Sequence, residues 1–254
     1  MDFTYIIAYR HSDERYKNLE TILKWISQTN CEIIIVEHDT TSKLDDLQSK
    51  IGFKKFLISN NLPFNKSWSF NVGFKNATND KIVFGDADLI MNQESLLKYI
   101  DMLDEYDVVS PYSSVVDLTK EETINYLKSN DIDSIYRIER PGRGETDHQK
   151  VPMCGGIILF NRDSLEKIGG WNEDFWGWGA EDDFMSNKSK MFLKFFEAKD
   201  KCYHLYHEKA PVYHDLYMRN LQIYTELSRC SINQMEAYIK VVSPIIGNID
   251  KKLN

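Results

Sequence analysis

Residues 82–88 read Ile82-Val83-Phe84-Gly85-Asp86-Ala87-Asp88, a short apolar run that ends in a glycine and two acids. A β-branched and aromatic run of this length is typical of a buried strand. Three similar runs precede it, at residues 6–9, 33–36 and 54–58, and a helix-like pattern at residues 19–26 separates the first two. Strands that alternate with helices predict an α/β fold with a mostly parallel central sheet flanked by helices.

The second half of the chain predicts further elements around the same core. Its apolar spacing indicates a buried strand at residues 154–160 and a helical tail at residues 215–240. Residues 139–150 have no apolar period and contain a proline and two glycines, so we expect a mobile loop there. We therefore expect one domain over residues 1–213 and a helical extension over residues 214–254 that packs on this domain or on a partner.

Composition and charge restrict the partners of this chain of 254 residues. Its net charge of −8 argues against a nucleic-acid partner, which requires concentrated positive charge. An acidic residue near the N-terminus and the absence of a long apolar run argue against a secretory signal and a transmembrane segment. We expect a protein in the cytoplasm or peripherally at the cytosolic face of a membrane. The widely spaced cysteines are expected to be reduced, and they are Cys31, Cys154, Cys202 and Cys230.

Polar residues follow three of the predicted strands, where ligands bind in open α/β sheets. They are Tyr9-Arg10, Glu37-His38-Asp39 and Asp86-Ala87-Asp88, and we expect them to converge on one crevice. Two carboxylates two residues apart are by themselves more often a solvated turn, but at a strand end both can face a hard cation. An acidic protein that binds an anionic nucleotide diphosphate beside such carboxylates needs a cation between them.

Residues 170–184 place three tryptophans among glycines, directly before three acids: Gly170-Trp171-Asn172-Glu173-Asp174-Phe175-Trp176-Gly177-Trp178-Gly179-Ala180-Glu181-Asp182-Asp183-Phe184. This pattern fits neither a regular helix nor a strand with two buried faces. The tryptophans either fill a core or form a stacking platform for a sugar ring, and we favour the platform. The acids begin a predicted helix, whose dipole favours ionised carboxylates. Such a carboxylate beside the platform is suited to accept a proton from an acceptor hydroxyl.

Two imidazoles three residues apart, His204 and His207, offer nitrogen ligands. We favour His207 as a metal ligand, whereas an ordinary surface or core role is the better reading for His204 and His214 from the residues alone. An imidazole added to carboxylates shifts the preference from Mg²⁺ towards Mn²⁺. We therefore expect Mn²⁺ as the cofactor, with Mg²⁺ as the alternative.

Several motifs, in this order, resemble the β-1,4-galactosyltransferase type of GT-A glycosyltransferase and the related N-acetylgalactosaminyl- and chondroitin-type transferases. They are Tyr9-Arg10, Phe64-Asn65-Lys66, Asn71-Val72-Gly73-Phe74, Asp86-Ala87-Asp88-Leu89, Gly155-Gly156, Trp176-Gly177-Trp178-Gly179-Ala180-Glu181-Asp182-Asp183 and His207. Together they span about residues 5 to 210. The resemblance implies a GT-A fold with a Rossmann-like nucleotide-binding half and an acceptor-binding half.

The resemblance also implies roles for individual residues. Asp182 would be the catalytic base. The donor nucleotide would contact Tyr9, Arg10, Asp39, Lys66 and Asp86, with Lys66 standing where the family has an arginine. The sugar and acceptor would contact Gly156, Trp176, Trp178 and Glu181. The metal ligands would be Asp88, His207 and His204, the last at the place of a methionine ligand in the family.

These roles predict an inverting transferase that moves a hexose or N-acetylhexosamine from a UDP-sugar to a hydroxyl of a glycan acceptor, as in polysaccharide biosynthesis. Galactose or N-acetylgalactosamine is the favoured sugar. The resemblance further implies that Trp176–Ala180 and the segment around His207 close over the donor, with residues 139–150 as an added candidate lid. Two other readings stay open: a metal-dependent nucleotide-sugar hydrolase, and a non-catalytic carbohydrate-binding protein with the same fold.

Overall fold

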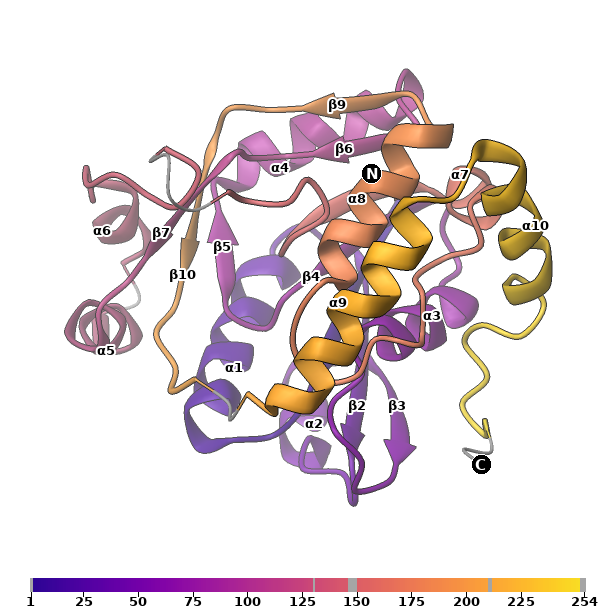
Figure 1. The fold of residues 1–254 in the computed structure, drawn as a ribbon. Helices are drawn as coiled ribbons and strands as arrows, with labels where there is room; N and C mark the ends of the chain where they lie inside the picture. The colour runs from indigo at the N-terminus through magenta and orange to yellow at the C-terminus, as the bar shows by residue number, and fades with distance from the viewer. Residues whose placement is uncertain (1, 130, 146–149, 210–211, 252–254) are drawn as a thin grey trace.

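The computed structural model describes residues 2–129, 131–145, 150–209 and 212–251, and its centre is a seven-stranded sheet (Figure 1). In spatial order the strands are β3 (Lys54–Ser59), β2 (Glu32–Asp39), β1 (Phe3–Tyr9), β4 (Lys81–Gly85), β8 (Ile158–Asn161), β6 (Val108–Ser110) and β9 (Phe195–Glu197). The first four are mutually parallel, and β8 runs antiparallel to both of its neighbours. The predicted mostly parallel α/β sheet is confirmed.

A smaller sheet extends from the end of β4. Its order is β5 (Leu89–Met91), β10 (Lys201–His204) and β7 (Ser114–Asp117). Strand β10 is antiparallel to β5 and parallel to β7. This sheet brings the end of β10 beside the residues that follow β4.

Helices cover both faces of the large sheet. They are α1 (Asp13–Ser27), α2 (Asp45–Ile51), α3 (Lys66–Asn76), α4 (Gln93–Asp101) with the 3₁₀ turn η1 (Met102–Asp104), α5 (Lys120–Ser129), α6 (Ile132–Tyr136), α7 (Arg162–Lys167), α8 (Glu181–Phe192), α9 (His214–Ser228) and α10 (Ile232–Val242). None of the helices in the described ranges is long and apolar enough to span a bilayer.

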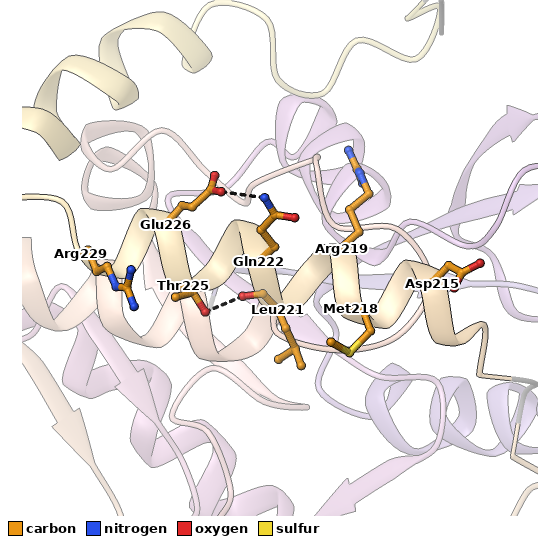
Figure 2. Close-up of a pocket in the computed structure, with 8 residues that line it drawn as sticks. All are labelled: Asp215, Met218, Arg219, Leu221, Gln222, Thr225, Glu226 and Arg229. Atoms are coloured by element: carbon orange, nitrogen blue, oxygen red, sulfur yellow. Dashed lines mark hydrogen bonds between the residues drawn. The ribbon is translucent and has the colours of Figure 1, made fainter.

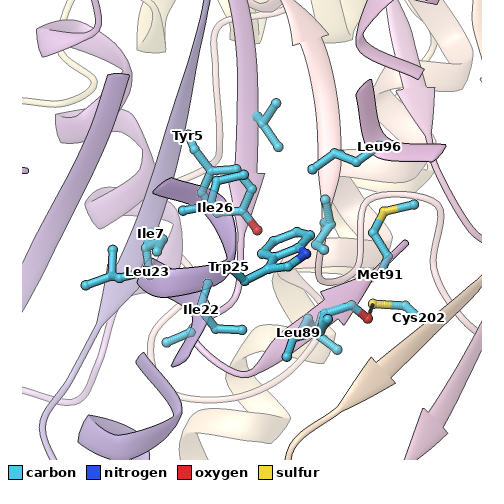
Figure 3. Close-up of a cluster of buried hydrophobic side chains, with 14 of the residues drawn as sticks. Tyr5, Ile7, Ile22, Leu23, Trp25, Ile26, Leu89, Met91, Leu96 and Cys202 are labelled. Carbon is cyan, nitrogen blue, oxygen red and sulfur yellow. Dashed lines mark hydrogen bonds between the residues drawn. The ribbon is translucent and has the colours of Figure 1, made fainter. Parts of the chain in front are cut away.

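The core explains why these segments fold as they do. Strand β1 is buried along its whole length, which accounts for its continuous apolar sequence. Figure 3 shows side chains from β1, α1, β5 and β10 meeting in the cluster on one face of the sheet. On the other face, α3 lies so close to β1 that a Cβ on Gly73 would come 2.3 Å from Cγ2 of Ile6. Glycine at this position therefore allows the helix to approach the sheet.

The structure corrects two predicted boundaries. The strand predicted at residues 154–160 begins only at Ile158, because the Tyr112 hydroxyl donates to the Gly155 carbonyl (2.5 Å) and accepts from the Ile157 amide (2.9 Å). These bonds fix a turn where we expected extended backbone. The predicted helical tail is two helices, since Ser231 forms a capping box that starts α10.

The loop predicted at residues 139–150 is only partly described. Arg143 exchanges backbone hydrogen bonds with Val115, and Arg140 forms an ion pair with Glu122 at 2.6 Å. Residues 146–149 lie outside the described residues. A mobile lid over residues 139–150 stays a prediction. The four cysteines are free, as expected.

The two C-terminal helices pack on the rest of the chain. Figure 1 shows α9 beside α8 on the outside of the molecule, and a small apolar cluster joins Phe184 of α8 to Met235 and Ile239 of α10. Farther along, the Asn248 carbonyl accepts from Nε1 of Trp68 in α3 at 2.9 Å. The boundary that we predict at residues 213/214 is therefore crossed by core contacts.

Candidate active site

Three candidate metal ligands, Asp88, His204 and His207, meet where the two sheets join. One ligand atom from each lies within 4.8 Å of the others. Asp88 follows β4, and the antiparallel pairing of β10 with β5 places His204 opposite Leu89. The distances from His207 Nε2 and His204 Nε2 to the Asp88 carboxylate are 3.2 Å and 3.7 Å. One buried carboxylate and two imidazoles thus face a common point.

The other ring nitrogen of each imidazole, Nδ1, also has a hydrogen-bond partner. Nδ1 of His204 lies 3.0 Å from the Asp117 carboxylate, and Nδ1 of His207 lies 2.8 Å from the Glu208 carbonyl. Protein metal sites commonly orient a ligating histidine in this way, through a hydrogen bond from its other nitrogen. This arrangement leaves both Nε2 atoms directed at Asp88.

The ionised carboxylate of this cluster can hold a cation, which would displace the proton that His207 shares with Asp88. Burial would raise the pKa of Asp88, but His204 and His207 outweigh it and lower the pKa to about 2. The hydrogen bond to Asp88 raises the pKa of His207. An ionised carboxylate beside two imidazoles suits Mn²⁺ better than Mg²⁺, which prefers oxygen ligands alone.

A second group of charged side chains lies at the same end of β4. Nζ of Lys66, the first residue of α3, is 3.0 Å from Oδ1 of Asp86 and 3.3 Å from Oδ1 of Asp182. The side chain of Asn65 accepts from the Trp68 amide and caps α3, and this cap places Lys66 at the first position of the helix. Burial would lower the pKa of Lys66, but Asp182 and Asp86 raise it above its ordinary value. Lys66 is therefore a fixed positive charge between two candidate site carboxylates.

The three acids that begin α8 have a different environment from the one expected. Burial, together with the nearby charges of Glu181 and Asp86 and against the opposing charge of Lys66, raises the pKa of Asp182 to about 8. Burial also raises the pKa of Glu181. The helix dipole does not offset this burial. Asp182, whose side chain is 22% exposed, therefore has the pKa of a proton acceptor that works near neutrality.

The tryptophans of residues 170–184 separate into a core part and an exposed part. Trp171 is 1% exposed and packs against Phe70 and Phe84, so it fills the core. Trp176 is half-buried against Trp68, with ring centroids 6.1 Å apart. Trp178 is 65% exposed. Of the three rings, Trp178 is the one that presents a broad open surface to a ligand.

The remaining predicted nucleotide and sugar residues also lie near strand ends. Tyr9 is buried at the end of β1, while Nε of Arg10 donates to the His38 carbonyl at 2.7 Å. Asp39 ends the adjacent parallel strand β2. A Cβ at Gly156, where φ is +79°, would lie 2.1 Å from the Tyr112 hydroxyl, so the turn requires glycine.

Several residues at the site were not predicted. Asp117 ends β7 and supports His204, and an acid at a strand end was the only available sequence signal. Tyr112 fixes the glycine turn. Tyr217 and Asn220 of α9 contact the Trp176–Gly179 segment, and no local sequence pattern indicates these contacts.

A polar cation site and a half-buried carboxylate at the carboxyl edge of an open α/β sheet are typical of enzymes that act on nucleotide-linked substrates. The chain belongs to glycosyl transferase family 2, whose family model matches residues 5–169. Residues 147–208 are similar to a second family model, described as the N-terminal domain of galactosyltransferase. The expected resemblance and the glycosyltransferase class are thereby confirmed.

Curated relatives and solved structures agree with this assignment. The chain is 25% identical over 138 residues to beta-1,4-galactosyltransferase 6 of Rattus norvegicus and to the same protein of Mus musculus. The match covers 50% of this chain but only 26% of those relatives.

Solved structures with low identity show the fold. S. aureus TarS 1-349 has a TM-score of 0.59 at 15% identity, covering 96% of this chain and 69% of that one. The catalytic domain of Drosophila beta1,4galactosyltransferase 7 has a TM-score of 0.51 at 15% identity, covering 90% and 79%. Glucosyl-3-phosphoglycerate synthase of Mycobacterium tuberculosis has a TM-score of 0.54 at 11% identity, covering 89% and 76%. The fold is therefore that of the GT-A glycosyltransferases.

Proposed function

We propose that this chain is an inverting, cation-dependent glycosyltransferase that moves a hexose or N-acetylhexosamine from a UDP-sugar to a hydroxyl of a glycan acceptor. Galactose or N-acetylgalactosamine is the favoured sugar. The observation that carries the proposal is the position of the Asp88–His204–His207 cluster beside the Lys66–Asp182 pair. One group suits a cation and the other suits proton transfer, as displacement of a diphosphate by an alcohol requires.

The cation would be held by Asp88, His204 and His207. When bound, it supplies positive charge against the diphosphate leaving group. The solved structure of the M. tuberculosis synthase contains Mn²⁺ and uridine diphosphate, which supports this choice of cofactor and nucleotide. The two imidazoles favour Mn²⁺, with Mg²⁺ as the alternative.

The remaining predicted roles are assigned to named side chains. Tyr9, Arg10 and Asp39 would contact the nucleotide, and Asp86 the ribose. Lys66 would face the diphosphate. Gly156, Trp176, Trp178 and Glu181 would contact the donor sugar or the acceptor.

Asp182 would act as the base in a single displacement. The acceptor oxygen forms a bond to the anomeric carbon while the bond from that carbon to the phosphate oxygen breaks. The electron pair of the broken bond leaves with UDP, and the acceptor proton goes to the Asp182 carboxylate. Attack opposite to the leaving group inverts the anomeric centre. That the transfer serves polysaccharide biosynthesis in the cytoplasm is part of this proposal.

The test is a panel of UDP-sugars assayed for UDP release with Mn²⁺, with and without candidate acceptors. Release that an acceptor stimulates supports transfer, whereas full release without acceptor indicates a hydrolase. Asp182→Asn should keep UDP binding and lose transfer, and the more exposed neighbour Asp183→Asn is the matched control. Normal transfer by Asp182→Asn would refute the assignment of the base. Glycan binding that is indifferent to UDP and Mn²⁺, with no turnover, would indicate a non-catalytic binding protein.

A further inference from the structure

The exposed ring of Trp178 has an aromatic support from the C-terminal helix α9. Its ring stacks on that of Tyr217, with centroids 5.6 Å apart and planes 22° from parallel. One face of the indole is therefore occupied by protein. A flat ring that is mostly exposed yet supported from behind has the form of a surface on which a sugar can stack.

Asn220 holds the backbone on either side of Gly177. This residue is 0% exposed, although asparagine is unfavourable in a helix interior. Its Nδ2 donates to the carbonyls of Trp176 (2.9 Å) and Trp178 (3.4 Å), and its Oδ1 accepts from the Trp176 amide (3.3 Å). A buried primary amide is costly unless it is bonded in this way. These hydrogen bonds therefore satisfy the buried side-chain amide of Asn220 and hold the backbone of residues 176–178 in place.

Other contacts anchor the same loop. The Gly177 amide donates to the Phe64 carbonyl at 2.8 Å, and the Gly179 amide donates to Glu181 at 3.1 Å. A Cβ at Gly179 would lie only 2.9 Å from the Tyr217 ring, so the loop and α9 are in close contact. Arg219, one of the α9 side chains drawn in Figure 2, donates to the Asp174 carbonyl at 2.9 Å.

We infer that Tyr217 and Asn220 are positioning residues that hold Trp178 as a ready-formed sugar platform, assembled before nucleotide or cation binds. The inference rests on the proposed function, in which Trp178 contacts the donor sugar or the acceptor, and it narrows this role to the acceptor. It differs from the expectation that Trp176–Ala180 closes over the donor. The loop is held by hydrogen bonds at residues 176, 177, 178 and 179 and by a stacked ring, and all of these contacts come from the protein itself.

Amide hydrogen exchange tests the ordering directly, with UDP and Mn²⁺ as probes. The amides of Trp176 and Gly177 should be protected in the free protein and change little when UDP and Mn²⁺ are added. Asn220→Ala should speed their exchange roughly tenfold or more, since it removes the buried partner. Gln222→Ala, on the outer side of the same helix, is the matched control. Amides that become protected only with UDP and Mn²⁺ would overturn the inference.

Kinetics test the positioning role separately. Tyr217→Ala should raise the acceptor KM roughly two- to tenfold, the range expected for an aromatic pair. The donor KM and UDP affinity should stay unchanged, and Tyr217→Phe should behave as wild type because it keeps the ring. A fall in kcat with an unchanged acceptor KM would contradict the role. If the wild type transfers no sugar, the proposed function fails, whereas the exchange experiment still decides whether the loop is preformed.

Discussion

Replacing Lys66 with methionine should move the pH dependence of transfer to higher pH. Lys66 is the cation nearest to the proposed base, with Nζ 3.3 Å from Asp182 and 3.0 Å from Asp86. Burial already raises the pKa of Asp182 to about 8, and Lys66 opposes this rise. Asp182 is ionised only above its pKa. Loss of the opposing charge therefore raises that pKa further and shifts the rising limb of the profile upwards.

The size of the shift follows from the geometry. At 3.3 Å and an effective dielectric constant of about 20, the ion pair contributes about 5 kcal/mol before desolvation is subtracted. Both groups are largely buried, so the cost of desolvation offsets much of this attraction. A net loss of about 1.4 kcal/mol when Lys66 is removed is enough to raise the pKa of Asp182 by one unit. A rise of about one unit lowers the ionised fraction at pH 7 from about 9% to about 1%. Transfer at pH 7 should thus fall roughly tenfold.

The assay is the pH profile of transfer at saturating UDP-sugar and Mn²⁺, since Lys66 is also proposed to face the diphosphate. Lys66→Met should lose most activity near neutrality and recover part of it at alkaline pH. Lys66→Arg keeps the charge and should retain the wild-type midpoint. Circular dichroism would confirm that both variants fold. An unchanged midpoint in folded Lys66→Met would show that this lysine does not control the base.

Three further predictions concern the support of the site. Asp117→Ala should weaken Mn²⁺ binding roughly 10- to 100-fold by calorimetry; unchanged affinity would argue against His204 as a ligand. Burial lowers the pKa of His38 from 6.5 to about 4. As the pH falls, His38 is therefore protonated in the unfolded chain at a higher pH than in the folded protein. The contribution of neutral His38 to the unfolding free energy is therefore fully present above about pH 6.5 and should fall by up to about 3 kcal/mol towards pH 4, as measured by urea titration. His38→Gln should remove this pH dependence. Asn71→Ala, which removes three buried hydrogen bonds, should cost about 3 kcal/mol of unfolding free energy, against little for exposed Asn233→Ala; equal costs would contradict this account.

The sheet could be predicted because burial on both faces leaves a direct record in sequence. Strands β1, β2 and β4 each contain an apolar run. The polar residues Glu37, His38 and Asp39, which we expected to follow β2, instead form its last three positions, and Glu37 and His38 are buried. The turn at Gly155-Gly156 was missed because its cause is distant in sequence. The Tyr112 hydroxyl bonds to both sides of the turn, and nothing near residue 155 reports that contact.

The parts of the site differ in the same way. The sequence favours His207 as a metal ligand, whereas from the residues alone His204 has the context of an ordinary histidine and only the family resemblance implies that it is a ligand. What distinguishes His204 is the pairing of β10 with β5 and β7, which places it between Asp88 and Asp117. Similarly, Trp171 and Trp178 share a glycine-rich context, and only the path of the backbone buries one and exposes the other.

The two acids of the Asp86-Ala87-Asp88 motif lie in different halves of the site. Asp86 pairs with Lys66, which also contacts Asp182, while Asp88 faces the two imidazoles. The motif therefore does not form one cation site with two equivalent carboxylates. Instead, Asp86 is linked through Lys66 to the proposed base, and Asp88, two residues later, belongs to the proposed cation site. Under the proposed function, Lys66 and the cation held by Asp88 and the two imidazoles would both supply positive charge to the diphosphate leaving group, although the protein as a whole is acidic.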